Sequence, residues 1–162
     1  MKKIIFKLVL SIAGFCAANG AIAGELVKSL KIEILLFSGR PNPTFLVTDP
    51  VQMKEILNLA KKLPQNKSIK QDVIGQPEAK LGYQGFIVTN NSDVSSEIKS
   101  ILVRGVDVHT ELIASSIVGG KTEVVKFAAL DSSSSLENKL LSQAKSKGIV
   151  DEKIIKVIEG SK

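Results

Sequence analysis

The sequence predicts one α+β domain, in which a mainly antiparallel sheet carries two or three helices on one face. Short runs rich in isoleucine, valine and leucine have the length of strands, and short turn-like segments separate several of them. Helical segments with clear capping residues interrupt these runs. No internal repeat is visible. Together these features place the chain in the α+β class as a single domain.

Most strands can be placed from apolar alternation and turn residues. The first, at residues 30–37, is apolar on nearly both faces, which is typical of a central strand. Residues 95–108 fit either a short helix or a strand bent at Gly105, and three β-branched valines favour the strand. Residues 110–118 fit a helical turn or the start of a strand. Further strands are expected at residues 44–48, 81–89 and 123–130.

The first helix is the most clearly marked element. Asp49 as N-cap, Pro50 at the first helical position and Gln52 in a capping box predict its start. Pro64 predicts its end. The buried stripe is expected to comprise Val51, Ile56, Leu59, Ala60 and Leu63.

Two later helices are expected near the end of the chain. Asp131 and the serines at 132–135 should cap a helix at residues 136–147. Gly148 is the expected residue after its last turn. Asp151 should cap a final short helix that ends at Glu159.

The strand at residues 81–89 contains two glycines, at positions 82 and 85. Glycine inside a strand marks either a β-bulge or a close approach of another backbone. Phe86 is expected in the core, and Tyr83 is expected to face solvent.

Residues 1–23 are expected to be a secretory signal peptide. Three lysines precede an apolar run at residues 8–18, and Ala-Ile-Ala at 21–23 fits a cleavage site. The apolar run is shorter than the ~20 residues that a membrane span needs. The mature domain, residues 24–162, should therefore be periplasmic or secreted, with no stable membrane insertion after cleavage.

The expected mature chain has a modest charge and no cysteine. Removing the three signal lysines from the 22 basic residues leaves 19 against 16 acidic ones, a net charge of +3. So small a charge gives no basis for a nucleic-acid partner. The one cysteine, Cys16, lies in the expected signal, which excludes disulfides and thiolate sites. A single histidine excludes a histidine metal cluster, although an all-carboxylate calcium site stays open. We expect neither a metal nor a cofactor.

Two motifs are similar to those of a family of uncharacterised small proteins. They are Phe-Ser-Gly-Arg-Pro-Asn-Pro at residues 37–43 and Leu-Gly-Tyr-Gln-Gly-Phe at residues 81–86. That family carries an SGRPNP loop and a GYxGF strand, and the likeness extends to Leu136 and Glu137. It often has an aromatic residue such as tryptophan soon after the loop, where this chain has Phe45. The resemblance implies that most of the mature chain is one domain. It assigns no activity and no catalytic residue to the chain.

The best candidate site is the loop at residues 38–43. One glycine frees its backbone, and two prolines restrict the backbone around Arg40 and Asn42. Such a stiff loop can present a guanidinium and a carboxamide to a carboxylate or phosphate at low entropic cost. Ser38 in the loop and Tyr83 in the third strand complete the set of candidate ligand-binding residues.

Arg40 also has a structural interpretation. It can pair with Asp107 or Asp131 and lock the hairpin as a latch, since arginine is equally the usual choice for internal ion pairs. The two interpretations differ in one testable respect: a binding residue should be exposed and free of a strong internal partner.

Three functions from different classes remain open. A small binding module would engage an acidic ligand or another protein through the 38–43 loop. A small hydrolase would have to centre on His109, although Ser38 and Ser115 lie in no recognisable nucleophile motif. A purely structural envelope protein needs only the fold. We prefer the binding module, a non-enzyme, and keep the hydrolase as an alternative.

Overall fold

The computed structural model describes residues 28–37, 39–66, 81–92, 98–115 and 122–160, so the expected signal peptide lies outside the described residues. The strands found there form one antiparallel sheet in the order β2-β1-β3-β4-β5-β6. They are β1 (Leu30–Phe37), β2 (Thr44–Val47), β3 (Gly82–Asn90), β4 (Ile98–Arg104), β5 (Asp107–Ser115) and β6 (Thr122–Leu130). The helices are α1 (Pro50–Lys62), α2 (Ser135–Ser146) and α3 (Glu152–Glu159). The predicted α+β single-domain fold is confirmed.

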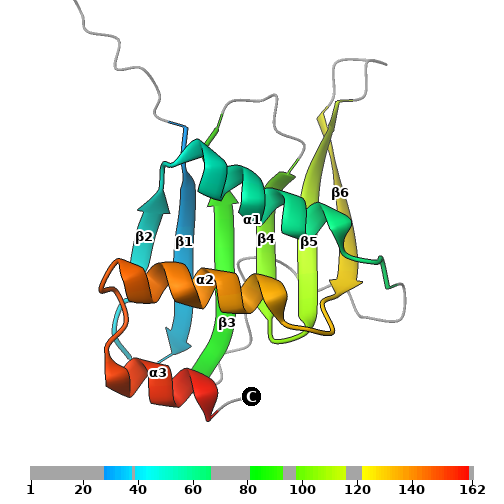
Figure 1. Ribbon diagram of the computed structural model, residues 1–162. Coiled ribbons are helices and arrows are strands. Elements are labelled where there is room, and N and C mark those ends of the chain that lie inside the picture. The colour runs from blue at the N-terminus through cyan, green and yellow to red at the C-terminus, as the bar shows by residue number, and fades with distance from the viewer. Residues whose placement is uncertain (1–27, 38, 67–80, 93–97, 116–121, 161–162) are drawn as a thin grey trace, which may run out of the picture.

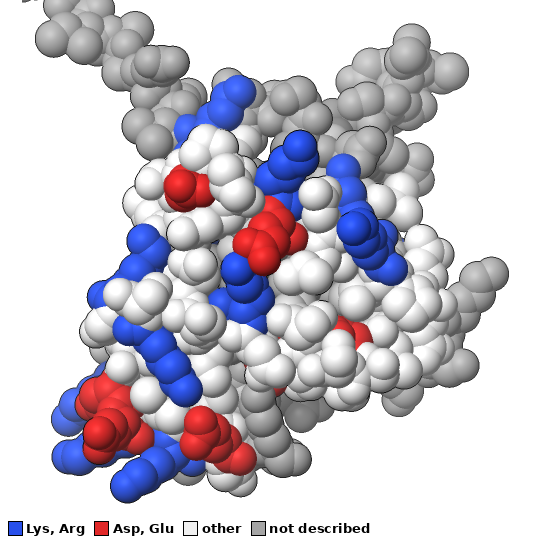
Figure 2. Space-filling model, in the orientation of Figure 1, with Lys and Arg blue, Asp and Glu red and all other residues white. Residues whose placement is uncertain are grey.

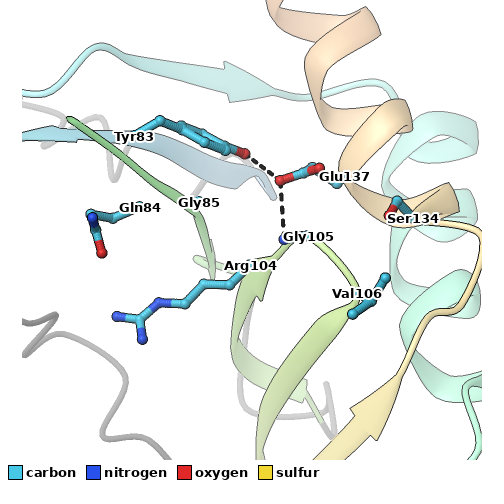
Figure 3. Close-up of a pocket in the computed structure, with 8 residues that line it drawn as sticks. All are labelled: Tyr83, Gln84, Gly85, Arg104, Gly105, Val106, Ser134 and Glu137. Atoms are coloured by element: carbon cyan, nitrogen blue, oxygen red, sulfur yellow. Dashed lines mark hydrogen bonds between the residues drawn. The ribbon is translucent and has the colours of Figure 1, made fainter. Parts of the chain in front are cut away.

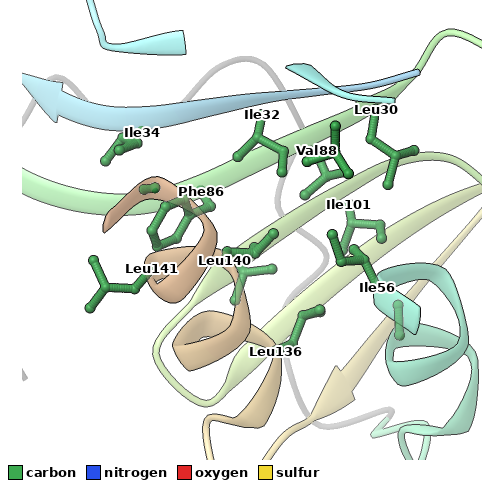
Figure 4. Packing of buried hydrophobic residues seen from close by; sticks show 14 of the residues in the cluster. Leu30, Ile32, Ile34, Ile56, Phe86, Val88, Ile101, Leu136, Leu140 and Leu141 are labelled. Carbon is green, nitrogen blue, oxygen red and sulfur yellow. The ribbon is translucent and has the colours of Figure 1, made fainter. Parts of the chain in front are cut away.

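All three helices cover the same face of the sheet (Figure 1). The core lies between the two layers, where Phe86 of β3 and Leu140 of α2 are fully buried (Figure 4). β1 is an interior strand, paired with β2 on one side and β3 on the other, as its apolar faces predict. No described helix is long and apolar enough to cross a membrane.

Gly85 of β3 is both a bulge residue and a point of close backbone approach. The register between β1 and β3 shifts between Leu35 and Leu36, which leaves Gln84 as the extra residue of the bulge. Gly85 has a φ of +108°. A Cβ at this position would lie 2.0 Å from the backbone oxygen of Val103 in β4. Gly85 therefore fits both interpretations of a glycine inside a strand, the β-bulge and the close approach of another backbone.

The expected strand bent at Gly105 is wrong, because the chain reverses there. β4 and β5 pair as a hairpin in which Arg104 lies opposite Asp107, so only Gly105 and Val106 form the turn. Gly105 has a φ of +58°, the positive value that a type II′ turn needs at its first central position. β5 then continues to Ser115, which decides for a strand there and against a helical turn.

The start of α1 agrees with its predicted cap. Asp49 Oδ1 accepts hydrogen bonds from the backbone N–H groups of Val51 and Gln52, both at 2.9 Å. The predicted stripe is wrong at Val51, whose side chain is 75% exposed. Val51 lies two residues before Met53 and therefore on the opposite side of the helix. The buried residues of α1 are Met53, Ile56 and Ala60.

α2 is capped by Asp131, with the serines as donors to it. Ser134, the N-cap residue, has a φ of +49° and makes no side-chain cap hydrogen bond. Asp131 instead accepts from the Leu136 N–H at 2.8 Å and from the Ser133 and Ser135 hydroxyls. Burial by itself would raise the pKa of Asp131, but these hydrogen bonds hold that pKa below its ordinary range. Asp131, rather than a serine, thus fixes the start of α2.

The end of α2 and the start of α3 agree with their predicted residues. Gly148 has a φ of +65°, and the N–H groups of Gly148 and Ile149 satisfy carbonyls of the last turn of α2 in a Schellman motif. Asp151 then caps α3 by accepting from the Ile154 N–H at 2.8 Å. Ile158 of α3 is fully buried, which fixes this helix over the sheet end where β3 begins (Figure 1).

Candidate functional site

Asn42 fastens the loop between β1 and β2 to β1. Its Oδ1 accepts from the Leu36 N–H at 2.9 Å, and its Nδ2 donates to Glu33 Oε1 at 2.8 Å. The backbone adds a bond from the Ile34 N–H to the Pro43 carbonyl at 2.9 Å. Both ends of the predicted ligand-binding carboxamide are thus engaged within the chain, and Asn42 makes the loop rigid. The other loop candidate, Ser38, lies outside the described residues.

Arg40 is exposed at the tip of this loop. Within the part of the chain that the structure describes, it forms no ion pair with Asp107, Asp131 or any other acid. Asp131 is instead committed to the start of α2. Asn42, rather than an ion pair of Arg40 among the described residues, thus fastens this loop, and Arg40 stays exposed.

Arg40 lines a groove of about 460 Å³ between the loop and α3. Among the described residues that line it, Lys153 of α3 is a second cation and Asp151 is the one acid. Figure 2 shows acidic and basic side chains gathered together around α3 at the lower left of the molecule. The apolar wall comprises Leu36, Pro41, Pro43, Ile154 and Val157. The groove therefore combines an apolar surface with two positive charges at its side.

Tyr83 lines a different cavity, of about 410 Å³, where β3 begins and β4 ends (Figure 3). The expectation that it faces solvent is wrong, because its ring packs edge-on against Phe86 at a centroid distance of 5.9 Å. Its hydroxyl donates to Oε1 of Glu137 at 2.5 Å. The same oxygen accepts the Gly105 N–H at 3.1 Å. Glu137 is 0% exposed and so joins α2 to β3 and to the β4–β5 turn.

Glu137 was not singled out from the sequence as a functional residue, although the sequence contains a signal for it. It lies three and four residues before Leu140 and Leu141, on the apolar stripe that α2 turns to the sheet. A carboxylate inside such a stripe must find hydrogen-bond donors in the core. Two donors are Tyr83 and the Gly105 N–H, and Figure 3 shows Arg104 extending away from Glu137.

The ionisation of Tyr83 tests this arrangement, since it is the only tyrosine in the chain. Burial, and then the hydrogen bond and charge of Glu137, raise the pKa of its hydroxyl far above the ordinary value of about 10. Above about pH 10 the unfolded chain loses a proton that the folded chain retains, so stability should fall as pH rises. We expect tyrosinate absorbance to rise only together with the loss of circular dichroism. An earlier rise, near pH 10 in a fully folded chain, would contradict this burial.

His109 lies on the sheet face opposite the helices, because its neighbour Val108 belongs to the core. It is 4% exposed and stands opposite Leu102 of β4. The acid next along this face, Glu111, accepts from the Ser100 hydroxyl at 2.8 Å and pairs with a lysine of β6. Burial would raise the pKa of Glu111, but these partners hold it below its ordinary range. A histidine this buried is not presented to a substrate, so no observation favours the hydrolase.

The described residues contain no group of three or more histidine, aspartate and glutamate side chains that could hold a metal ion. Comparison with known proteins finds no matching family model, no matching curated protein and no matching solved structure.

Proposed function

We propose that the chain is a small exported binding module, periplasmic or secreted, which holds an acidic ligand or an acidic group of another protein through Arg40. The observation that carries the proposal is the position of this arginine. It is exposed, lines a groove, and has no acidic partner among the described residues. An arginine without an internal partner can give both N–H groups of its fork to an incoming carboxylate.

The loop that carries Arg40 supports a binding role because its conformation is already fixed. Asn42 ties it to β1 through two hydrogen bonds, and prolines stand on both sides of that residue. Pre-organisation of this kind lowers the entropy lost on binding. Lys153, across the groove, adds a second positive charge to the same surface. The backbone of the loop is thus held in place, and the Arg40 guanidinium can adjust to the ligand.

Arg40→Ala should separate binding from folding. We expect the free energy of unfolding to change by no more than about 0.5 kcal/mol, as for other exposed residues. Binding of a polyanionic probe such as citrate should weaken about tenfold, because a charge-assisted pair is lost. Urea denaturation measures the first quantity. Chemical-shift titration of the chain from residue 24 onward measures the second.

The matched control is Lys31→Ala, which removes an equal charge from β1, the strand that leads into the loop. Lys31 is exposed on β1, next to Ile32 of the core and therefore on the opposite face. It should leave citrate binding unchanged. A fall in stability of about 3 kcal/mol for Arg40→Ala would instead restore the latch, and equal effects of the two variants on binding would refute a specific site.

A further inference from the structure

The groove beside Arg40 has features that restrict its ligand beyond the presence of an acid. Its volume of about 460 Å³ lies within the ~300–1,000 Å³ typical of ligand sites. Most of its lining is apolar: Leu36 and two loop prolines on one side, Ile154 and Val157 on the other. A bare anion would use Arg40 and leave this apolar surface in water.

The apolar wall of α3 is open to solvent rather than closed over by the sheet. Val157 is 46% exposed, although it lies one residue before Ile158, which is fully buried. Ile154 and Val157 are three residues apart and so lie on the same side of α3, which faces the loop (Figure 1). Covering such a surface stabilises a complex in proportion to the apolar area removed from water. An apolar group beside the anion is therefore favoured.

The polar groups of the groove distinguish a polypeptide from a fatty acid. Arg40 and Lys153 are donors and match a carboxylate. Asp151 is an acceptor in the same wall, and among the described residues its Oδ1 accepts the Ile154 N–H. A carboxylate has lone pairs for further donors. A peptide offers N–H groups to such an acceptor, whereas a fatty acid offers none.

Resting on the proposed function, we infer that the groove binds a polypeptide segment in which an apolar side chain adjoins a carboxylate. The carboxylate pairs with Arg40 and Lys153, the apolar side chain covers Ile154 and Val157, and a backbone N–H meets Asp151. The carboxylate can be a chain terminus or an acidic side chain, since both present the same group to the arginine.

The test uses the chain from residue 24 onward and five probes in a calorimetric or chemical-shift titration. Acetyl-dileucine with a free carboxylate is the carboxylate peptide, and its amide is the neutral peptide. Acetyl-leucyl-glutamate amide carries the acid on a side chain. Acetate and decanoate are the bare and acyl carboxylates. We expect the carboxylate peptide to bind at least about tenfold more tightly than the neutral peptide or acetate.

Two variants show which part of the groove binds the carboxylate and which part binds the apolar side chain. Arg40→Ala should remove the tenfold advantage of the carboxylate peptide over the neutral one. Val157→Ser, at a half-exposed position, should weaken the carboxylate peptide about threefold and leave acetate unchanged. The side-chain acid peptide shows which source of carboxylate is preferred, and tight binding of either peptide supports the inference.

The outcomes separate this inference from the function on which it rests. If acetate binds as tightly as the carboxylate peptide and still depends on Arg40, the apolar wall plays no part and the inference fails alone. If decanoate binds more tightly than both acidic peptides, the occupant is an amphiphile and the inference again fails alone. If no probe responds to Arg40→Ala, the proposed function fails with it.

Discussion

Gly85→Ala is expected to lower the free energy of unfolding by more than about 4 kcal/mol, enough to unfold many single domains. Its φ of +108° is one that L residues rarely adopt. The added Cβ would also lie 2.0 Å from the Val103 carbonyl oxygen, a backbone atom that cannot rotate away. Relief would require β3 and β4 to separate in the middle of the sheet. Urea denaturation followed by circular dichroism measures the loss.

Gly82→Ala provides a closely matched control. Gly82 is also in β3 and has a φ of +99°, but among the described residues no heavy atom beyond its two chain neighbours lies within 4 Å of the position of its Cβ. It should therefore show the conformational cost alone, about 1–3 kcal/mol. The difference between the two alanine variants isolates the clash. Equal losses would mean that the approach of β3 to β4 does not determine the need for glycine.

The elements that local sequence predicted well are those that local contacts stabilise. Asp49 caps α1 through N–H groups two and three residues away, and Gly148 ends α2 through the last helical turn. Side chains at these positions act on their own neighbours, so the sequence contains the whole interaction. The glycines of β3 were recognisable for a different reason. A backbone position that excludes a Cβ restricts the residue type directly, even though the excluding atom at Gly85 belongs to β4.

The errors occur where distant segments decide the outcome. The alternation before and after Gly105 fits one bent strand or two paired strands equally well, and only pairing with β3 and β6 distinguishes them. Val51 has the apolar character of a stripe residue, but the direction in which α1 packs leaves it exposed. Tyr83 faces the core because Glu137, from the far end of the chain, accepts its hydroxyl.

The candidate site divides in the same way. The loop residues could be chosen from the sequence because glycine and proline restrict their backbone. The opposite wall could not, since Lys153, Ile154 and Val157 look like ordinary residues of an amphipathic helix. Only the packing of α3 beside the β1–β2 loop brings them to Arg40 (Figure 1). A groove made by two segments from opposite ends of the chain has no local signature.

Glu137→Leu is expected to cost about 3 kcal/mol of stability, because it removes the acceptor of two donors at once. The Tyr83 hydroxyl and the Gly105 N–H would both lose their bond to Oε1. An unsatisfied buried donor costs about 1–3 kcal/mol. Leucine fills a similar volume, so the loss reports hydrogen bonding more than a cavity. Glu137→Gln, which retains a carbonyl acceptor, should lose only about 1 kcal/mol.

A second substitution makes the test specific to this pair. Tyr83→Phe alone should cost about 1 kcal/mol, since one hydrogen bond is lost. Introduced into Glu137→Leu, the same change should restore about 1 kcal/mol, because it removes the hydroxyl that lacks an acceptor. A substitution that destabilises the native chain and stabilises the variant can be explained only by coupling between the two side chains. If the two losses instead simply add in urea denaturation, Glu137 stabilises the domain by another route, and the junction of α2 with β3 does not depend on this bond.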